Sequence, residues 1–281
     1  MIKFGNFVIK DNNSWLGEST SPGPTPPTPV LPAGTVRVRT SDGNAPVKGS
    51  EYTSYETATL VSGTSDVYDV YKSGTSFRDL LVKSTNVAEV LGANTTGITN
   101  MQSMFQQCTA LTSVALFDTS SVTYMGTMFY RCTSLTSVPL FDTSNVTDMS
   151  GMFSFCPLTT VPLFDTSSCT YMSQMFGYCS SLTTVPLFDT SSVTRMDYMF
   201  CECGSLTSIP LFDTSSATNM DYMFVVCTNV ESGALALYQQ ASTQTTPPSS
   251  HSNTFYLCGY DTVTGAAELA QIPATWGGSG S

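Results

Sequence analysis

Cysteine is the residue whose chemistry and spacing suggest a function first. Nine cysteines occur in 281 residues, and six recur at one position of an internal repeat: Cys108, Cys132, Cys156, Cys179, Cys203 and Cys227. Thiols stacked one strand spacing apart could form disulfides, bind metal or serve as small apolar core residues. We favour buried free thiols, because Met and Phe precede this position in each copy. The close pair in Cys201-Glu202-Cys203 has no second pair or histidines beside it and predicts no zinc site.

Five aspartates form a second recurring set: Asp118, Asp142, Asp165, Asp189 and Asp213. Carboxylates about 5 Å apart along one edge could bind calcium, which prefers oxygen ligands. Asp-Thr-Ser is also a turn sequence in which the Asp side chain accepts a nearby backbone N–H. Asn94 stands at the equivalent place without a charge. The sequence therefore favours the turn, and calcium remains the alternative.

The sequence offers no catalytic constellation. His251 is the single histidine and lies in the polar stretch STQTTPPSSHSN, where we expect a solvated loop residue. Catalysis by a serine or cysteine paired with histidine would depend on that one residue. Glycine-rich phosphate loops are missing from the sequence, and paired acids cannot be singled out from identical aspartates. We therefore expect a protein that is not an enzyme, with no catalytic residues, no cofactor and no metal.

The positions of these residues follow from a repeat of about 24 residues. Twelve of the thirteen methionines form Met-x-x-Met pairs that begin at Met101, Met125, Met149, Met172, Met196 and Met220. A leucine recurs at Leu111, Leu135, Leu158, Leu182 and Leu206, and an FDTS string at Phe117, Phe141, Phe164, Phe188 and Phe212. The segment 77–90 aligns with 101–114, and Phe255 and Cys258 repeat the Phe-x-x-Cys spacing. Atypical end copies are typical of a solenoid.

The repeat predicts a mainly β solenoid. Each copy contains L-x-x-V-P-L, similar to the strand of a leucine-rich repeat, and then an alternating V-T-x-M segment. The M-F-x-x-C segment is short enough for a 3₁₀ or single helical turn. We expect a right-handed coil of about 24 residues per turn, with Leu, Val, Met, Phe and Cys stacked inside. Proline within the strand lacks an N–H and must lie where no ladder bond is needed.

The copies resemble the BspA-like leucine-rich-repeat family, in particular its short methionine-rich branch in bacterial and mycoplasma surface proteins. FDTSSVTYMGTMFYRCTSLTSVP at 117–139 and its later copies carry the resemblance, which covers residues from about 77 to 258. It implies a curved solenoid and a surface-binding role, usually adhesion. It offers no catalytic residues to transfer.

The remaining chain is organised around the repeat. We expect an N-terminal docking segment at 1–17, a Pro-rich linker at 18–34, a β cap at 35–76, the solenoid at 77–231 and a C-terminal capping region at 232–281. A short apolar segment on a semi-rigid proline spacer favours docking into another structural protein. The alternative is packing on its own solenoid. The candidate docking residues are Ile2, Phe4, Phe7, Val8 and Trp15.

Positions that vary among the copies mark the candidate ligand face. They are the third residue of V-T-x-M, the pair inside M-x-x-M and the pair before each cysteine. The candidate residues there are Tyr124, Tyr130, Arg131, Tyr171, Tyr178, Arg195, Tyr198 and Tyr222. Tyr and Arg are enriched in binding surfaces, whereas unconstrained drift favours Ser, Lys and Glu. We therefore predict a face that binds a host cell-surface glycan or protein.

Charge and hydropathy narrow the functional class. Residues 84–281 hold two basic and thirteen acidic residues, and the whole chain carries −11. Such a surface repels phosphate backbones, which argues against nucleic-acid binding. No apolar run is long enough for membrane insertion, and no secretory signal precedes the fold, so we do not expect export by the Sec route.

Three functional hypotheses follow. The first is a non-catalytic binding protein attached by its N-terminus to a larger particle, a phage virion or tail, at the virion or particle surface. The second is a bacterial adhesin located at the cell surface or outside the cell. The third is a purely architectural decoration protein without a ligand.

Overall fold

The computed structural model describes residues 3–4, 7–10, 14–16, 30–49 and 51–280, and divides the chain into the compact units Met1–Val30 and Leu31–Ser281. The first unit is an antiparallel sheet in the order β1-β2-β3, with strands β1 (Lys3–Phe4), β2 (Phe7–Lys10) and β3 (Ser14–Leu16). The strands fall within the predicted docking segment. Ile2 lies outside the described residues, as do the side chains of Phe4, Phe7, Val8 and Trp15, so their docking role stays a prediction.

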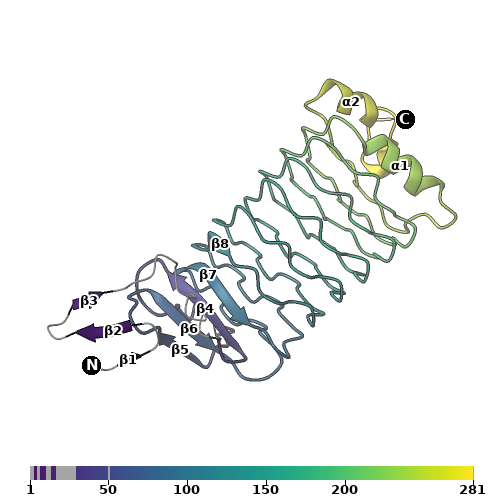
Figure 1. The fold of residues 1–281 in the computed structure, drawn as a ribbon. Helices are drawn as coiled ribbons and strands as arrows, with labels where there is room; N and C mark the ends of the chain where they lie inside the picture. The colour runs from purple at the N-terminus through teal and green to yellow at the C-terminus, as the bar shows by residue number, and fades with distance from the viewer. Residues whose placement is uncertain (1–2, 5–6, 11–13, 17–29, 50, 281) are drawn as a thin grey trace. The chain divides into compact units, whose positions relative to one another are not determined.

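The second unit begins with a five-stranded sheet in the order β5-β6-β4-β7-β8 (Figure 1). Its strands are β4 (Thr35–Thr40), β5 (Thr57–Leu60), β6 (Val67–Tyr71), β7 (Val87–Asn94) and β8 (Ser113–Val114). Along β4, Val36 and Val38 are fully buried, whereas Arg37 reaches the Asp69 carboxylate on β6 at 2.7 Å. This alternation is the pattern that predicts strands in the cap. Asn94 donates to the Leu31 carbonyl at 2.6 Å, so the second unit already includes the end of the predicted linker.

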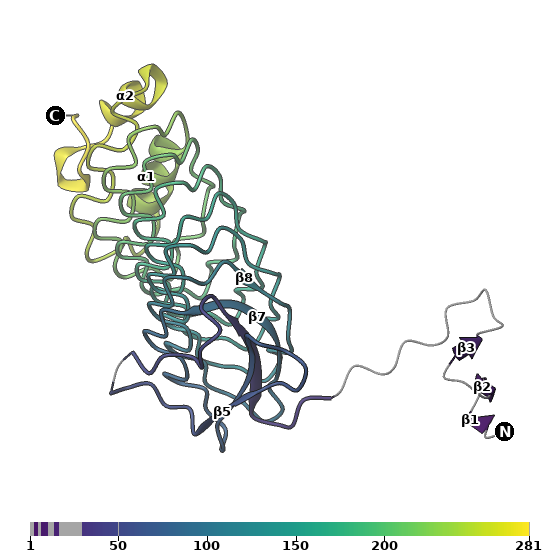
Figure 2. The ribbon, with the colours of Figure 1, turned by 90° about the vertical axis from the view of Figure 1, so that its left-hand side faces the viewer.

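Parallel pairing carries this sheet into a stack of coils (Figures 1 and 2). β7 pairs with β8 in parallel, and one parallel bridge per coil continues through Ser76, Asn100, Tyr124, Asp148, Tyr171, Arg195, Asn219 and Ser250. The M-x-x-M-F-x-x-C segment adds backbone bonds from coil to coil, such as Thr127 N to Ser150 O and Arg131 N to Ser154 O, both 2.8 Å. Each coil is thus fixed to the next by its main chain.

The repeated apolar residues fill the interior of the stack. Met128, Met152 and Met199 are fully buried, and the leucine and cysteine columns lie beside them. The phenylalanines that follow the second methionine stack ring on ring, with centroids 5.7 Å apart for Phe129 and Phe153 and 5.2 Å for Phe200 and Phe224. The predicted burial of these columns is confirmed. The copy at 77–90 joins them through the buried residues Phe77, Leu80, Leu81, Ser84, Val87 and Val90.

Two local predictions were wrong. The L-x-x-V-P-L segment forms no strand after β8, because coil-to-coil bonding there is sparse, as in Thr183 N to Thr159 O at 3.1 Å. The M-F-x-x-C segment is a series of turns instead of a 3₁₀ or α-helical turn. Residues such as Arg131 adopt left-handed backbone there, with φ of 58°, which a 3₁₀ helix does not allow. The handedness of the coil and its leucine-rich-repeat class stay predictions.

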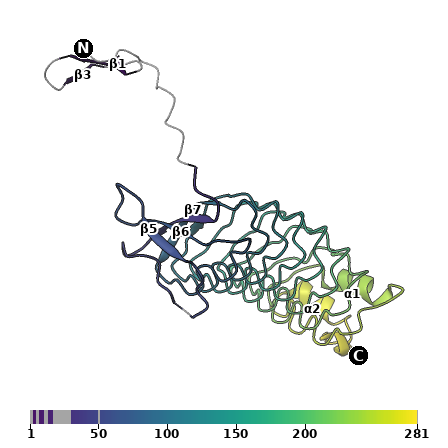
Figure 3. The ribbon, with the colours of Figure 1, turned by 90° about the horizontal axis from the view of Figure 1, so that it is seen from below.

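Helices cover the last coil. They are α1 (Ala234–Thr243), α2 (Val263–Leu269) and the 3₁₀ helix η1 (Ala274–Trp276). The Glu268 carboxylate on α2 accepts the backbone N–H of Leu235 at 3.1 Å and so satisfies a free donor at the start of α1. Figure 3 shows β5 and β6 at one end of the second unit and α1 and α2 at the other. Within the described residues, none of the helices combines the length and apolar character that crossing a bilayer requires.

Candidate functional site

The residues between the buried Met, Phe and Cys positions reach the surface of the stack. Two of them per coil have left-handed backbone, one just before the second methionine and one just before the cysteine. The N–H groups of both bond to the next coil, as in Gln107 N to Tyr130 O at 2.7 Å. The side chains of these slots are therefore held in rows that run from coil to coil.

Aromatic side chains from consecutive coils contact one another in these rows. Phe155 stacks on Tyr178 with ring centroids 4.3 Å apart and an interplanar angle of 4°, and Tyr130 meets the edge of Phe155 at 5.6 Å. The Arg131 guanidinium lies 4.7 Å from the Phe155 centroid and 5.4 Å from that of Tyr130, within cation–π range. The sequence placed Tyr130, Arg131 and Tyr178 on variable slots, and the structure joins them with Phe155 into one cluster.

A second aromatic pair continues the cluster. Tyr198 stacks on Tyr222 at 4.9 Å. Tyr178 hydrogen-bonds with Cys201, and this neighbouring thiol together with partial burial raises the pKa of Tyr178. Partial burial and the neighbouring Tyr222 likewise raise the pKa of Tyr198. Both phenols are thus neutral near pH 7. We call the set Tyr130, Arg131, Phe155, Tyr178, Tyr198 and Tyr222 the aromatic face.

The other predicted residues form a separate column. Tyr124, Asp148, Tyr171 and Arg195 follow one another along the chain of parallel bridges. Tyr124 and Tyr171 are exposed but separated by Asp148, and Arg195 is paired with Asp197 at 3.1 Å. Tyr124 and Tyr171 thus belong to one column, and the stacked pair Tyr198 and Tyr222 belongs to another. Tyr198 is also exposed, whereas its stacking partner Tyr222 is half-buried.

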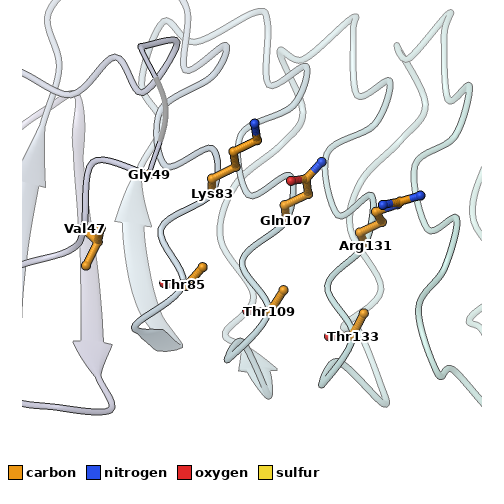
Figure 4. Close-up of a pocket in the computed structure, with 8 residues that line it drawn as sticks. All are labelled: Val47, Gly49, Lys83, Thr85, Gln107, Thr109, Arg131 and Thr133. Carbon is orange, nitrogen blue, oxygen red and sulfur yellow. The ribbon is translucent and has the colours of Figure 1, made fainter.

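A hollow of about 420 Å³ lies beside Arg131 (Figure 4). Lys83, Gln107 and Arg131 occupy the left-handed slot before the cysteine column in three successive coils, with φ of 58°, 60° and 58°. The picture shows their side chains as one row and the threonines as a second row. The full lining is Val47, Gly49, Lys83, Thr85, Gln107, Thr109, Arg131 and Thr133. We call this the cationic hollow. Sequence reasoning included Arg131 but missed Lys83, although the 24-residue spacing places both in one row.

The cysteines lie beneath these surfaces, and Cys201 contacts the aromatic face through its hydrogen bond with Tyr178. All nine are free and buried, and the thiols of the column donate to a carbonyl of the preceding coil, as in Cys132 Sγ to Phe105 O at 3.1 Å. Burial raises the pKa of Cys108 and Cys179 to about 12. Such thiols are protonated near pH 7 and unreactive. The structure agrees with the interpretation as core residues.

The aspartates close turns, as predicted. Asp118 Oδ1 accepts the backbone N–H of Ser120 at 2.9 Å and its hydroxyl at 2.7 Å. Asn94 makes the same two bonds with Thr96. The serine bonds lower the pKa of Asp118, Asp165 and Asp189, since they stabilise the charged form. Within the described ranges, no three His, Cys, Asp or Glu side chains gather closely enough to hold a metal ion.

An exposed row of leucines was not predicted. Leu116, Leu140, Leu163, Leu187 and Leu211 are between 53% and 62% exposed. They belong to L-x-x-V-P-L, whose last leucine in a leucine-rich repeat would point inward. The next residue is the buried Phe of FDTS, and adjacent residues of an extended chain point to opposite sides. The buried Phe next to each leucine was thus the signal in the sequence from which the exposure of the leucines could have been predicted.

His251 also differs from its prediction as a solvated loop residue. Its ring stacks on Trp276 at 4.1 Å and 5°, and Nδ1 is buried without a hydrogen-bond partner among the described residues. The helical C-terminal segment packs on the loop and shields Nδ1 from water, while the residue stays partly exposed.

The fold and these surfaces define a repeat protein whose stacked coils present rows of variable side chains. A family model described as "Mycoplasma protein of unknown function, DUF285" matches residues 75–158 and 156–246. The chain belongs to this family, and the match supports a BspA-related repeat. No curated protein and no solved structure gave a significant match.

Proposed function

We propose that this chain is a non-catalytic binding protein that holds a host cell-surface ligand on its aromatic face. The observation that carries the proposal is the stacking of side chains across coils, above all Phe155 on Tyr178 and Tyr198 on Tyr222. Rings held by one another lose little conformational freedom on binding. Their faces suit the apolar faces of sugar rings, and their hydroxyl groups suit polar ligands. A glycan or a protein surface would fit this chemistry.

We further propose that the stack is a right-handed solenoid of leucine-rich-repeat type, mounted on a phage particle by residues 1–17. These residues belong to the unit Met1–Val30, which is divided from the repeats, and this division supports an attachment role. A bacterial surface adhesin is the second candidate; the family description refers to Mycoplasma proteins, which are bacterial, and gives no function.

Paired double variants test the binding face. Tyr198→Ala with Tyr222→Ala removes one stacked pair, and Tyr256→Ala with Tyr260→Ala removes two exposed tyrosines outside the aromatic face. Purified variants are applied to immobilised polysaccharides and to intact bacterial cells. We expect the first pair to lose about tenfold or more in affinity and the second to bind like the native chain, with melting temperatures within a few degrees. Equal binding by both would leave the architectural role as the better explanation.

Deletion of residues 1–17 tests attachment. We expect the truncated chain to fold, as shown by an unchanged circular dichroism spectrum, and to be missing from purified particles. Normal incorporation would place the attachment elsewhere.

A further inference from the structure

The cationic hollow is unusual in so acidic a chain. It is lined by one lysine, one arginine, one glutamine and three threonines, and none of its lining residues is acidic. Residues 84–281 contain only two basic residues, and one of them, Arg131, lies here. Lys83, from the preceding part of the chain, lies in the same row (Figure 4).

The two cations of the hollow have no carboxylate partner in the described part of the chain. The other arginines do: Arg37 pairs with Asp69 at 2.7 Å, Arg39 with Glu89 at 2.5 Å, Arg78 with Asp79 at 3.4 Å and Arg195 with Asp197 at 3.1 Å. Arg131 instead lies over the rings of Tyr130 and Phe155. An anionic group of a ligand could therefore pair with both Lys83 and Arg131.

The backbone holds these donors at fixed intervals. Lys83 N donates to Gln106 O at 2.7 Å and Arg131 N to Ser154 O at 2.8 Å, so each slot is fastened to the following coil. Neighbouring coils lie about 4.8 Å apart, which places the two cationic slots about 10 Å apart with the Gln107 amide between them. A row of ammonium, amide and guanidinium donors fits a polymer with repeated anionic groups better than one compact ion.

The row continues directly into the aromatic face. Arg131 contacts Tyr130 and Phe155, and Phe155 stacks on Tyr178. An acidic polysaccharide offers both matching features, anionic groups for the cations and sugar ring faces for the aromatic rings. Nucleic acid fits less well, because its phosphates follow one another much more closely than the two cationic slots, so most of them would face the acidic chain without a cation.

We propose that the cationic hollow binds the carboxylate or sulfate groups of an acidic polysaccharide whose sugar rings lie on Tyr130, Phe155 and Tyr178. The hydroxyl groups of Thr85, Thr109 and Thr133 supply further donors along the same path. This inference rests on the proposed function of the aromatic face and names its class of ligand.

The test measures binding of the full chain to four immobilised polymers by biolayer interferometry. Polygalacturonate carries carboxylates, dextran sulfate carries sulfates, dextran is neutral, and poly-glutamate is an acidic polymer without sugar rings. The variants Lys83→Gln and Arg131→Gln each remove one charge from the hollow. Arg78→Gln is the matched control, because it removes one exposed charge outside the lining of the hollow.

We expect the native chain to bind one or both acidic polysaccharides, and the two arms distinguish carboxylate from sulfate as the preferred group. Each hollow variant should lose about tenfold or more in affinity, whereas Arg78→Gln should stay within about twofold. Raising the salt concentration should weaken the native chain more than the Lys83→Gln, Arg131→Gln double variant. Melting temperatures of all variants should agree within a few degrees, since the side chains are exposed.

Several outcomes overturn the proposal. They are binding to none of the polymers, binding to dextran or poly-glutamate as tight as to the acidic polysaccharides, and acidic binding that survives in the double variant. If the chain binds dextran and this binding depends on Tyr198 and Tyr222, the cationic hollow does not select an acidic ligand. The aromatic face would still be a binding surface, as the proposed function states. If binding to the acidic polysaccharides needs Lys83 but not Tyr198 and Tyr222, the stacked tyrosine pair does not bind the ligand. Anion binding by the cationic hollow would then stand alone.

Discussion

Leu182 and Leu187 provide a matched test of how the coils pack. They lie five residues apart in one coil, and Leu182 is 0% exposed whereas Leu187 is 60% exposed. Replacing each with alanine removes the same atoms from two opposite environments. The difference between the two losses of stability therefore measures burial alone.

The magnitudes follow from burial. Leu182→Ala should lower the free energy of unfolding by about 2–5 kcal/mol, because it loses transfer energy and leaves a cavity among columns that cannot collapse. Leu187 keeps only two fifths of its surface buried. Since full burial of a leucine contributes about 1.5–3 kcal/mol, Leu187→Ala should cost about 1 kcal/mol or less. For a unit of this size, each kcal/mol lowers Tm by about 2–4 °C.

The assay is urea denaturation of both variants followed by circular dichroism, with thermal melting as a second measurement. Stacked repeats can unfold in parts, so a change in the slope of the transition must be examined before free energies are compared. Equal losses for the two variants would refute the packing described above. A larger loss for Leu187→Ala would mean that the exposed row of leucines is buried in solution, for example by self-association.

Two further predictions concern pH and the turns. Burial raises the folded-state pKa of thiols such as Cys108 to about 12, so stability should be fully present below the unfolded thiol pKa near pH 9 and should fall as pH rises toward 12. Chemical denaturation between pH 7 and 11 measures this, and a flat profile would contradict buried protonated thiols. Asp189→Asn should keep the turn and the melting temperature at pH 7, as Asn94 does, whereas Asp189→Ala should lower it by removing the acceptor for Ser191. The serine bonds lower the pKa of Asp189, so its contribution is present above pH 4 and lost on acidification. A calcium-dependent rise in the native melting temperature that the Asn variant lacks would support the calcium alternative instead.

The columns of the core could be predicted because their spacing is written in the sequence. A residue that recurs every 24 positions lies above its copies, so the burial of Met128 or Cys132 follows from the repeat. The Asp turns were equally accessible, since Asn94 showed that the position needs an acceptor and not a charge. The spacing of the repeat thus predicts which side chains stack in a row, without any use of helix or strand propensity.

Backbone conformation within the turns could not be predicted in this way. Left-handed residues are ordinarily indicated by glycine, yet these slots hold Arg131, Phe155 and Tyr178, and Gly151 is a rare exception with φ of 62°. The stacking of His251 on Trp276 was hidden for a different reason. It depends on a helical segment outside the repeat, whose path has no periodic signal.

The left-handed slots connect the fold to the proposed binding face. A residue other than glycine costs about 1 kcal/mol or more in this conformation, and the cost recurs in every coil. Glycine would remove it without disturbing the coil-to-coil bonds, because those use only the main chain, as in Arg131 N to Ser154 O. Lys83, Arg131 and Tyr178 stand at such slots, so the strained backbone holds their side chains in rows. The same conformation recurs at Gln174, Glu202 and Val226, so the strain belongs to the rows of the whole stack, within which the unpaired charges and the stacked rings lie.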